Sequence, residues 1–234
     1  MKNFLSMISQ HQHTFLVKGY SSIDNVKQVE RVIQKDSKIP LSLFKNLNTL
    51  LDELRSGKEK NIPFSHIEKA IRFDGFNPEL FLNLHTKFLK FQDLGYNLVV
   101  DVGLDDILSK YYKGSNYTAI HYCGLVSATP TIIAGNTMAV HAGWTEVVAY
   151  DELVRQTVTW GSVSGQSVNN SASKAVFTIS TNDTDIGGGF VTTDNVKSAT
   201  DGILVGAAAF TAGNKSLDDN DTLSVTVTAT SAAT

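Results

Sequence analysis

Between residues 22 and 95, apolar positions recur every three to four residues, which is the period of an amphipathic helix. The strongest stripe runs through residues 41–57, and similar stripes occupy residues 21–36 and 76–95. An S-x-x-E capping box at residues 65–68 opens a further helix. The pattern predicts four short helices that pack as a small bundle.

The period changes after Gly95. Residues 98–102 have the pattern of a short strand, followed by a helix of about ten residues that ends near Gly114. Beyond Asn116, short strand-like segments alternate with turn clusters rich in Gly, Asn, Asp and Ser. This alternation is typical of an antiparallel β-sandwich of jelly-roll or immunoglobulin type.

The predicted fold class is therefore α+β. A helical bundle is expected over residues 1–95 and an antiparallel β-sandwich with one short helix over residues 96–234. We expect the first domain to serve docking or assembly. The closing segment TLSVTVTATSAAT, residues 222–234, carries no charged side chain, and we expect it to form an exposed sheet edge.

Charge is distributed unevenly along the chain, whose net charge is −3. Residues 1–100 hold 14 Lys and Arg against 10 Asp and Glu, whereas residues 101–234 hold 6 against 13. Neither part has the dense basic patch that phosphate neutralisation requires, so we do not expect nucleic acid as a partner. No apolar run approaches the roughly 20 residues of a membrane span, so we expect no membrane partner. Opposite charge on the two parts favours head-to-tail contact between subunits.

The single cysteine and the N-terminal sequence indicate no reactive or targeting site. Cys123 is the only cysteine, which excludes an intrachain disulfide and a cysteine-based metal site. Its strand-like context predicts a buried, inert thiol. The first residues lack the pattern of a secretory signal, and we expect the HQH sequence at His11 and His13 to be flexible.

The segment HAGWTEVVAY, residues 141–150, places His141, Trp144 and Glu146 close together in sequence. General acid–base or nucleophilic catalysis would require a group that reaches substrate and a third residue that orients it, and the segment supplies neither. We expect Trp144 to be a large plug at the end of the sandwich, with its indole N–H bonded to a carbonyl. A ligand contact and a catalytic role are the alternatives.

Other motifs match catalytic or metal-binding patterns only in part. The S-x-x-K match at Ser171–Lys174 lies before a strand instead of a helix, and its partner motifs are missing. Asp183, Asp185 and Gly187 follow the start of a calcium loop that no acidic residue closes at the required distance. We interpret these segments, the Asp218–Asp221 cluster, the Gly187–Gly189 run, and the His11–His13 and His121–His141 pairs as structural. The sequence therefore predicts no catalytic, cofactor-binding or metal site, and no enzyme.

From about Asn97 onward the order of features resembles a family of small virion structural proteins of tailed bacteriophages, described as structural, head-decoration or fibre-associated proteins. The most specific part of the resemblance is carried by Asn136, Thr137, Met138, His141, Gly143, Trp144, Glu146, Tyr150, Glu152 and Arg155. We call the last seven of these the signature residues. The resemblance implies that they stabilise the fold, and we expect Arg155 to pair with Glu146 or Glu152. The helical first 95 residues lie outside it.

The resemblance implies a non-enzymatic component of a phage particle, assembled in the host cytoplasm, that decorates or cements the capsid or anchors a fibre to it. The implied partners are the major capsid protein or other virion proteins, and copies of the chain itself, with a trimer favoured. A tail or fibre component that binds host-surface carbohydrate is the alternative. A hydrolase on a sandwich scaffold is a third, disfavoured hypothesis.

Overall fold

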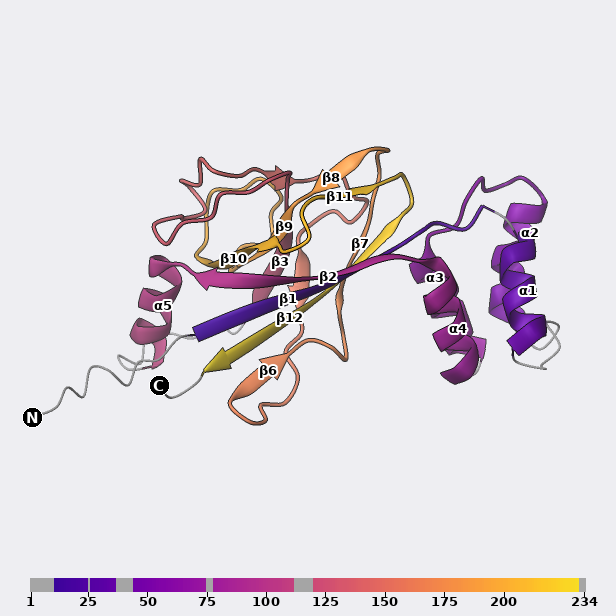
Figure 1. The fold of residues 1–234 in the computed structure, drawn as a ribbon, viewed down its shortest axis with the longest axis horizontal. Coiled ribbons are helices and arrows are strands. Elements are labelled where there is room, and N and C mark those ends of the chain that lie inside the picture. Colours follow the sequence, from indigo (N-terminus) through magenta and orange to yellow (C-terminus); the bar gives the residue numbers. More distant parts are fainter. Residues whose placement is uncertain (1–10, 25, 37–43, 75–77, 112–119, 232–234) are drawn as a thin grey trace, which may run out of the picture.

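The computed structural model of the protein describes residues 11–24, 26–36, 44–74, 78–111 and 120–231. A large antiparallel sheet forms a body, and four helices project from one end of it (Figure 1). The helices are α1 Val26–Asp36, α2 Lys45–Arg55, α3 Phe64–Asp74, α4 Pro78–Phe88 and α5 Asp101–Tyr111. The predicted mixture of helices and antiparallel strands is confirmed.

The strands are β1 His11–Tyr20, β2 Leu89–Val99, β3 His121–Val126, β4 Glu146–Val147, β5 Gln156–Val158, β6 Ser167–Asn169, β7 Ala175–Thr178, β8 Thr184–Ile186, β9 Gly188–Thr192, β10 Leu204–Phe210, β11 Lys215–Leu217 and β12 Thr222–Ser231. Within the described residues, ten strands form one sheet in the order β4-β3-β9-β10-β2-β1-β12-β6, with β5 beside β3 and β7 beside β12. Strands β8 and β11 form a second, two-stranded sheet.

The four projecting helices are an insertion between two paired strands of the body. Strand β1 precedes α1 and strand β2 follows α4, and the two strands pair antiparallel from Thr14↔Tyr96 to Tyr20↔Leu89. We call residues 21–88 the helical insertion and the remainder the body. The predicted boundary at residue 95 is therefore wrong, because residues 11–20 and 89–95 belong to the sheet.

The error has a local cause at each strand. The helical period of α4 continues past its end at Phe88 into Phe91, so the sequence alone does not mark where β2 begins. The HQH sequence was predicted to be flexible, but it lies in β1, whose partners in β12 are about 210 residues away in sequence. Neither strand carries a local signal of its pairing. Gly114 and Asn116, predicted near the end of the next helix, lie outside the described residues.

The C-terminal strand is not an exposed edge, contrary to the prediction. Strand β12 pairs with β1 over ten residues on one side and with β6 and β7 on the other. Residues 222–227 are buried. A strand in the interior of a sheet needs no charge to prevent association, which explains the uncharged composition.

Three apolar clusters lie among the residues that the structure describes. The largest lies in the body and receives side chains from most strands of both sheets, for example Phe15, Leu125, Phe177 and Val225. The second lies wholly within the helical insertion and the residues that flank it, where Leu47, Leu51, Ile67 and Ile71 pack together. The third surrounds Trp144 and Phe190. The insertion therefore has its own core.

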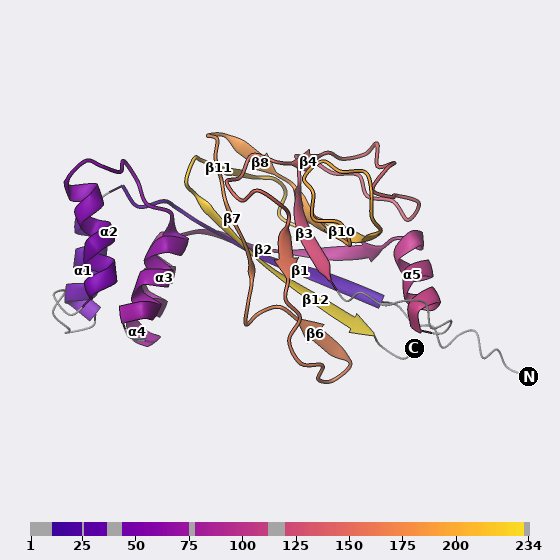
Figure 2. The same ribbon diagram turned by 180° about the vertical axis from the view of Figure 1, so that it is seen from behind.

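Helix α5 covers the body at the end opposite the insertion, as the view from behind shows (Figure 2). It packs on β10, where Gly103 allows the close approach, because an added Cβ would overlap the Val205 carbonyl oxygen. Among the described residues, none of the helices combines the length and hydrophobicity that crossing a membrane requires.

Candidate functional site

The seven signature residues lie in and around one corner of the body, between residues 141 and 155. Regular structure in this segment is limited to the two-residue strand β4. The structure arranges the residues around two centres, Trp144 and Arg155, which both contact Phe190 of strand β9. The Trp144 and Phe190 ring centroids are 5.3 Å apart, and the Arg155 Cζ atom lies 5.3 Å from the Phe190 ring centroid.

Trp144 is a buried plug, as the sequence predicted, with only 4% of its surface exposed. Its indole Nε1 donates to Oδ1 of buried Asn136 at 3.2 Å, and the same oxygen accepts from the Ile133 backbone N–H at 3.1 Å. The His141 ring stacks on the indole at a centroid distance of 3.9 Å. His141 Nδ1 donates to the Trp144 carbonyl oxygen at 2.9 Å, which fixes the imidazole tautomer. Nδ1 of His141 and Nε1 of Trp144 are thus both used within the fold.

Gly143 permits this arrangement because an added Cβ would overlap the backbone oxygen of Thr131. The two segments are joined there by a hydrogen bond from Thr131 N–H to Gly143 C=O at 2.9 Å. Any larger residue at position 143 would push the Trp144 segment away from its neighbour.

Arg155 is fully buried and its guanidinium is bonded on every side. Nε and Nη2 donate to the two carboxylate oxygens of Glu146 at 2.9 and 2.8 Å. Nη1 donates to the Asp194 carbonyl oxygen at 3.0 Å, and Nη2 also donates to that of Ala199 at 3.0 Å. The Glu146 carboxylate accepts a further bond from the Ser198 N–H at 2.8 Å. Of the two predicted partners, Glu146 is therefore the one that pairs with Arg155.

Glu152 has a different role. Its two carboxylate oxygens each accept from the Thr178 backbone N–H at 3.1 Å, which joins the segment after β4 to the end of β7. Burial raises the pKa of Glu152, and the hydrogen bonds from Thr178 oppose that shift. An isolated bridge between Tyr150 and Ile179 continues the same junction.

Tyr150 packs edge-to-face on Phe177 at a centroid distance of 5.0 Å. The Lys197 ammonium lies 3.7 Å from the Tyr150 ring centroid and donates to the carbonyl oxygens of Tyr150 at 2.7 Å and Val148 at 3.3 Å. Burial of the phenol raises the pKa of Tyr150. The hydroxyl therefore stays protonated at neutral pH.

The other candidate residues do not assemble with this corner. His121 accepts a hydrogen bond from Trp160 Nε1 at 3.1 Å, so it is not paired with His141. Cys123 is buried, and burial raises the pKa of its thiol, which favours the unreactive form. Lys174 and Ser171 lie in a turn before β7. Over the part of the chain with described side chains, no group of three His, Cys, Asp or Glu residues is placed to hold a metal ion.

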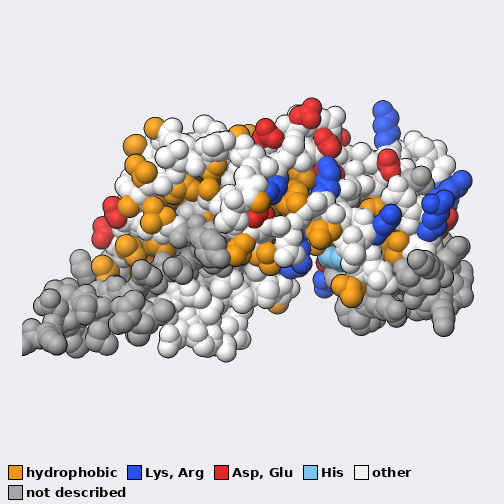
Figure 3. Space-filling view, viewed as in Figure 1, with side chains coloured by type: hydrophobic (Ala, Val, Ile, Leu, Met, Phe, Trp, Pro, Cys, Tyr) orange, Lys and Arg blue, Asp and Glu red, His pale blue; other side chains and the backbone are white. Residues whose placement is uncertain are grey.

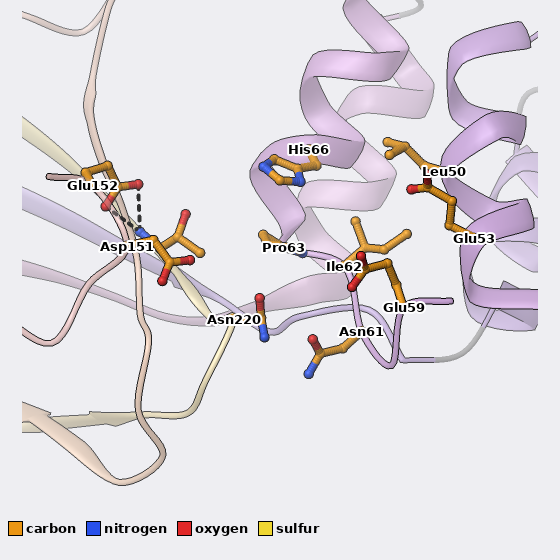
Figure 4. Close-up of a pocket in the computed structure, with 11 residues that line it drawn as sticks. Leu50, Glu53, Glu59, Asn61, Ile62, Pro63, His66, Asp151, Glu152 and Asn220 are labelled. Carbon is orange, nitrogen blue, oxygen red and sulfur yellow. Dashed lines mark hydrogen bonds between the residues drawn. The ribbon is translucent and has the colours of Figure 1, made fainter. Parts of the chain in front are cut away.

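A cleft of about 520 Å³, which the sequence pattern does not predict, lies between the helical insertion and the body (Figure 4). The body wall carries Asp151 and Glu152, and the facing wall carries Pro63 and His66 of the insertion. Its remaining lining residues are Leu50, Glu53, Glu59, Asn61, Ile62, Thr178 and Asn220. The two walls are about 90 residues apart in sequence, so no local pattern predicts their meeting.

No protein-family model, curated protein or solved structure matches this chain.

Proposed function

We propose that the protein is a non-enzymatic structural component of a tailed-bacteriophage particle, which decorates or cements the capsid or anchors a fibre to it. The observation that carries the proposal is the use made of the signature side chains. His141, Trp144, Glu146, Glu152 and Arg155 each use a side-chain polar group in a bond to another group of the same chain. They stabilise a corner of the fold, as the resemblance to virion proteins implies.

The architecture suits a protein whose function is contact between subunits. The helical insertion has its own core and extends from the body on the paired strands β1 and β2 (Figure 1). In this proposal the insertion contacts the major capsid protein or another virion protein. The chain also associates with itself, with a trimer favoured, and resides in the virion after assembly in the host cytoplasm. Nucleic acid and membrane are not partners in this proposal.

We also propose that the body is a β-sandwich of jelly-roll or immunoglobulin type. Its main apolar cluster joins residues of β1 and β12 to residues of β3, β5 and β7. The bridge between Tyr150 and Ile179 connects the segment after β4 to the segment after β7. Both observations support a sheet that folds over one enclosed core.

The alternative is a tail or fibre component that binds host carbohydrate, for which exposed aromatic side chains are the usual platform. Every aromatic side chain whose exposure the structure describes is buried or half-buried, including Trp144 and Trp160. The side chains of Tyr111, Tyr112 and Tyr117, which the sequence left as candidates, lie outside the described part. The described surface therefore favours the structural role.

The test combines mass in solution with binding to particles stripped of this protein. We expect the full chain to form an oligomer and to co-sediment with the stripped particles. A control with His141→Gln should behave in the same way as the wild type, because His141 does not contact the partner in this proposal. A monomeric chain with no affinity for the particles, or saturable binding to a host glycan, contradicts the proposal.

A further inference from the structure

Two neighbouring loops of the body, residues 148–154 and 194–201, expose apolar side chains beside carboxylates. Leu153 is 91% exposed, Val196 53%, Val148 43% and Val154 40%. Asp151 and Asp201 on the same loops are also exposed. The loops are joined by a hydrogen bond from Arg155 N–H to Asn195 C=O at 2.8 Å. We call these four apolar residues and Asp151 the Leu153 platform.

The buried bonds behind the platform hold both loops in place. Arg155 bonds Glu146 and the carbonyl oxygens of Asp194 and Ala199, and Lys197 bonds the carbonyl oxygens of Val148 and Tyr150. These bonds restrain both loops on either side of Leu153, whose side chain is 91% exposed. Exposed apolar side chains on a preorganised support are typical of a surface that a partner covers.

The chain's own insertion does not cover the platform. The cleft of about 520 Å³ separates the platform's Asp151 from His66 of helix α3 and from Pro63, which precedes that helix (Figure 4). Leu153 follows the cleft-lining residue Glu152 and remains almost fully exposed. A covering surface must therefore come from another molecule.

The charges of the helical insertion and of the body indicate which surface of another molecule covers the platform. On the helical insertion the exposed charged side chains are nine cations and three acids, among the residues whose burial is described. The cations are Lys27, Arg31, Lys45, Arg55, Lys58, Lys60, Lys69, Arg72 and Lys87, and the acids are Asp24, Asp52 and Glu59. Figure 3 shows Lys and Arg side chains gathered over the helices.

The body has the opposite balance, with eight exposed acids and two exposed cations in its described part. The acids are Asp101, Asp105, Asp151, Asp183, Asp185, Asp201, Asp218 and Asp219, and the cations are Lys90 and Lys174. Complementary charge steers two such surfaces together and disfavours the contact of body with body. The insertion also offers an apolar side chain on α4, where Leu82 is 64% exposed and Thr86, one turn further along the same face, is also exposed.

We infer that the Leu153 platform of one copy binds the helical insertion of a second copy, around Leu82 of α4. The contact is head-to-tail, with two different surfaces, so its repetition closes a ring when the rotation per subunit allows it. This inference rests on the self-association in the proposed function and assigns the two surfaces that form it.

The experiment measures the mass of the full chain over a concentration series for three variants. Leu153→Asp removes the platform, Leu82→Asp removes the insertion surface, and Val163→Asp is the matched control at a side chain that is 75% exposed elsewhere on the body. We expect both interface variants to be monomers with unchanged circular dichroism and unfolding midpoint. The control should keep the wild-type mass. Leu153→Ser serves as a second platform variant if Leu153→Asp does not fold.

Mixing the two interface variants gives the decisive result. Each variant retains the surface that the other lacks, so an equimolar mixture should form a heterodimer and nothing larger. A mixture that stays monomeric overturns the inference. If Leu82→Asp alone keeps the wild-type mass, the insertion is not the occupant and platforms meet each other instead.

Two further outcomes overturn the inference while leaving the proposed function standing. In the first, Leu153→Asp keeps the wild-type mass but loses binding to stripped particles, which assigns the platform to another virion protein. In the second, Leu153→Asp keeps the oligomeric mass of the wild type but small-angle scattering shows a more extended particle, which assigns the platform to the chain's own insertion. A wild-type chain that is monomeric at all concentrations overturns the inference and the proposed self-association together. Particle binding then tests the remainder of the proposed function.

Discussion

Replacing Arg155 with alanine is expected to lower the free energy of unfolding by about 3–5 kcal/mol, because it leaves a buried carboxylate without its cation. Arg155 is 0% exposed, and the Glu146 side chain is 6% exposed. After the substitution, Glu146 keeps its bond from the Ser198 N–H, while the carbonyl oxygens of Asp194 and Ala199 each lose a donor. Natural domains are stable by about 5–15 kcal/mol, so this loss removes a large share of the margin.

The assay is urea denaturation followed by circular dichroism, with Arg72→Ala as the matched control. The Arg72 side chain is 59% exposed and pairs with Glu68 one helical turn away, an arrangement worth less than about 1 kcal/mol. The double variant Arg155→Met, Glu146→Leu should recover part of the loss, because apolar residues of similar volume carry no desolvation penalty. A loss at Arg155 no larger than the loss at Arg72 would refute the reasoning.

Three other perturbations have expected outcomes. Trp144→Ala should lower the free energy of unfolding by about 3–5 kcal/mol in urea denaturation, as aromatic truncations in cores do, and a stable variant that instead lost ligand binding would contradict the structural role. Burial lowers the pKa of His85 to about 4, so the unfolded chain, which titrates near 6.5, binds the proton first. The free energy of unfolding should therefore fall as pH drops from about 6.5 to about 4. The fall should be smaller in His85→Gln. Equal pH profiles for the wild type and His85→Gln would contradict the contribution of His85. A chain in which a two-residue turn replaces residues 23–87 should keep a folded body, as measured by circular dichroism. A chain that starts at Asn97 and therefore lacks β1 should not fold. The reverse outcome would contradict the sheet order.

The sequence predicted the elements that depend on short-range pattern. The helical stripes placed Ile23, Val29, Leu47 and Leu51 in a core, and the structure buries all four. The pairing of Arg155 with Glu146 was one of two alternatives, because nine and three residues of separation are both within reach of a long side chain. Only the folded corner selects between them, since the backbone turns Glu152 toward Thr178.

The sequence failed where the decisive contact is distant. Strand β1 gains its conformation from β12, which closes the chain, and no pattern in residues 11–20 reports that partner. The same pairing converts the C-terminal strand from a predicted edge into an interior strand. The cleft was also missed because its walls come from the insertion and from the loop after β4.

The insertion's position in the chain determines how a force on the insertion would reach the body. Ser21 N–H donates to the Phe88 carbonyl oxygen at 2.9 Å and Ser22 N–H donates to Asp221 Oδ1 at 2.9 Å, so both ends of the insertion are fixed beside the start of β12. The ammonium of Lys90 bonds the other oxygen of the same buried Asp221. Strands β1, β2 and β12 are adjacent in the interior of the large sheet. A load applied to the insertion by a neighbouring subunit therefore passes into ladder hydrogen bonds along these three strands. A helical module joined to the body by a flexible linker would pass such a load to the body at one point of the chain only, so an insertion between paired strands suits the assembly role proposed above.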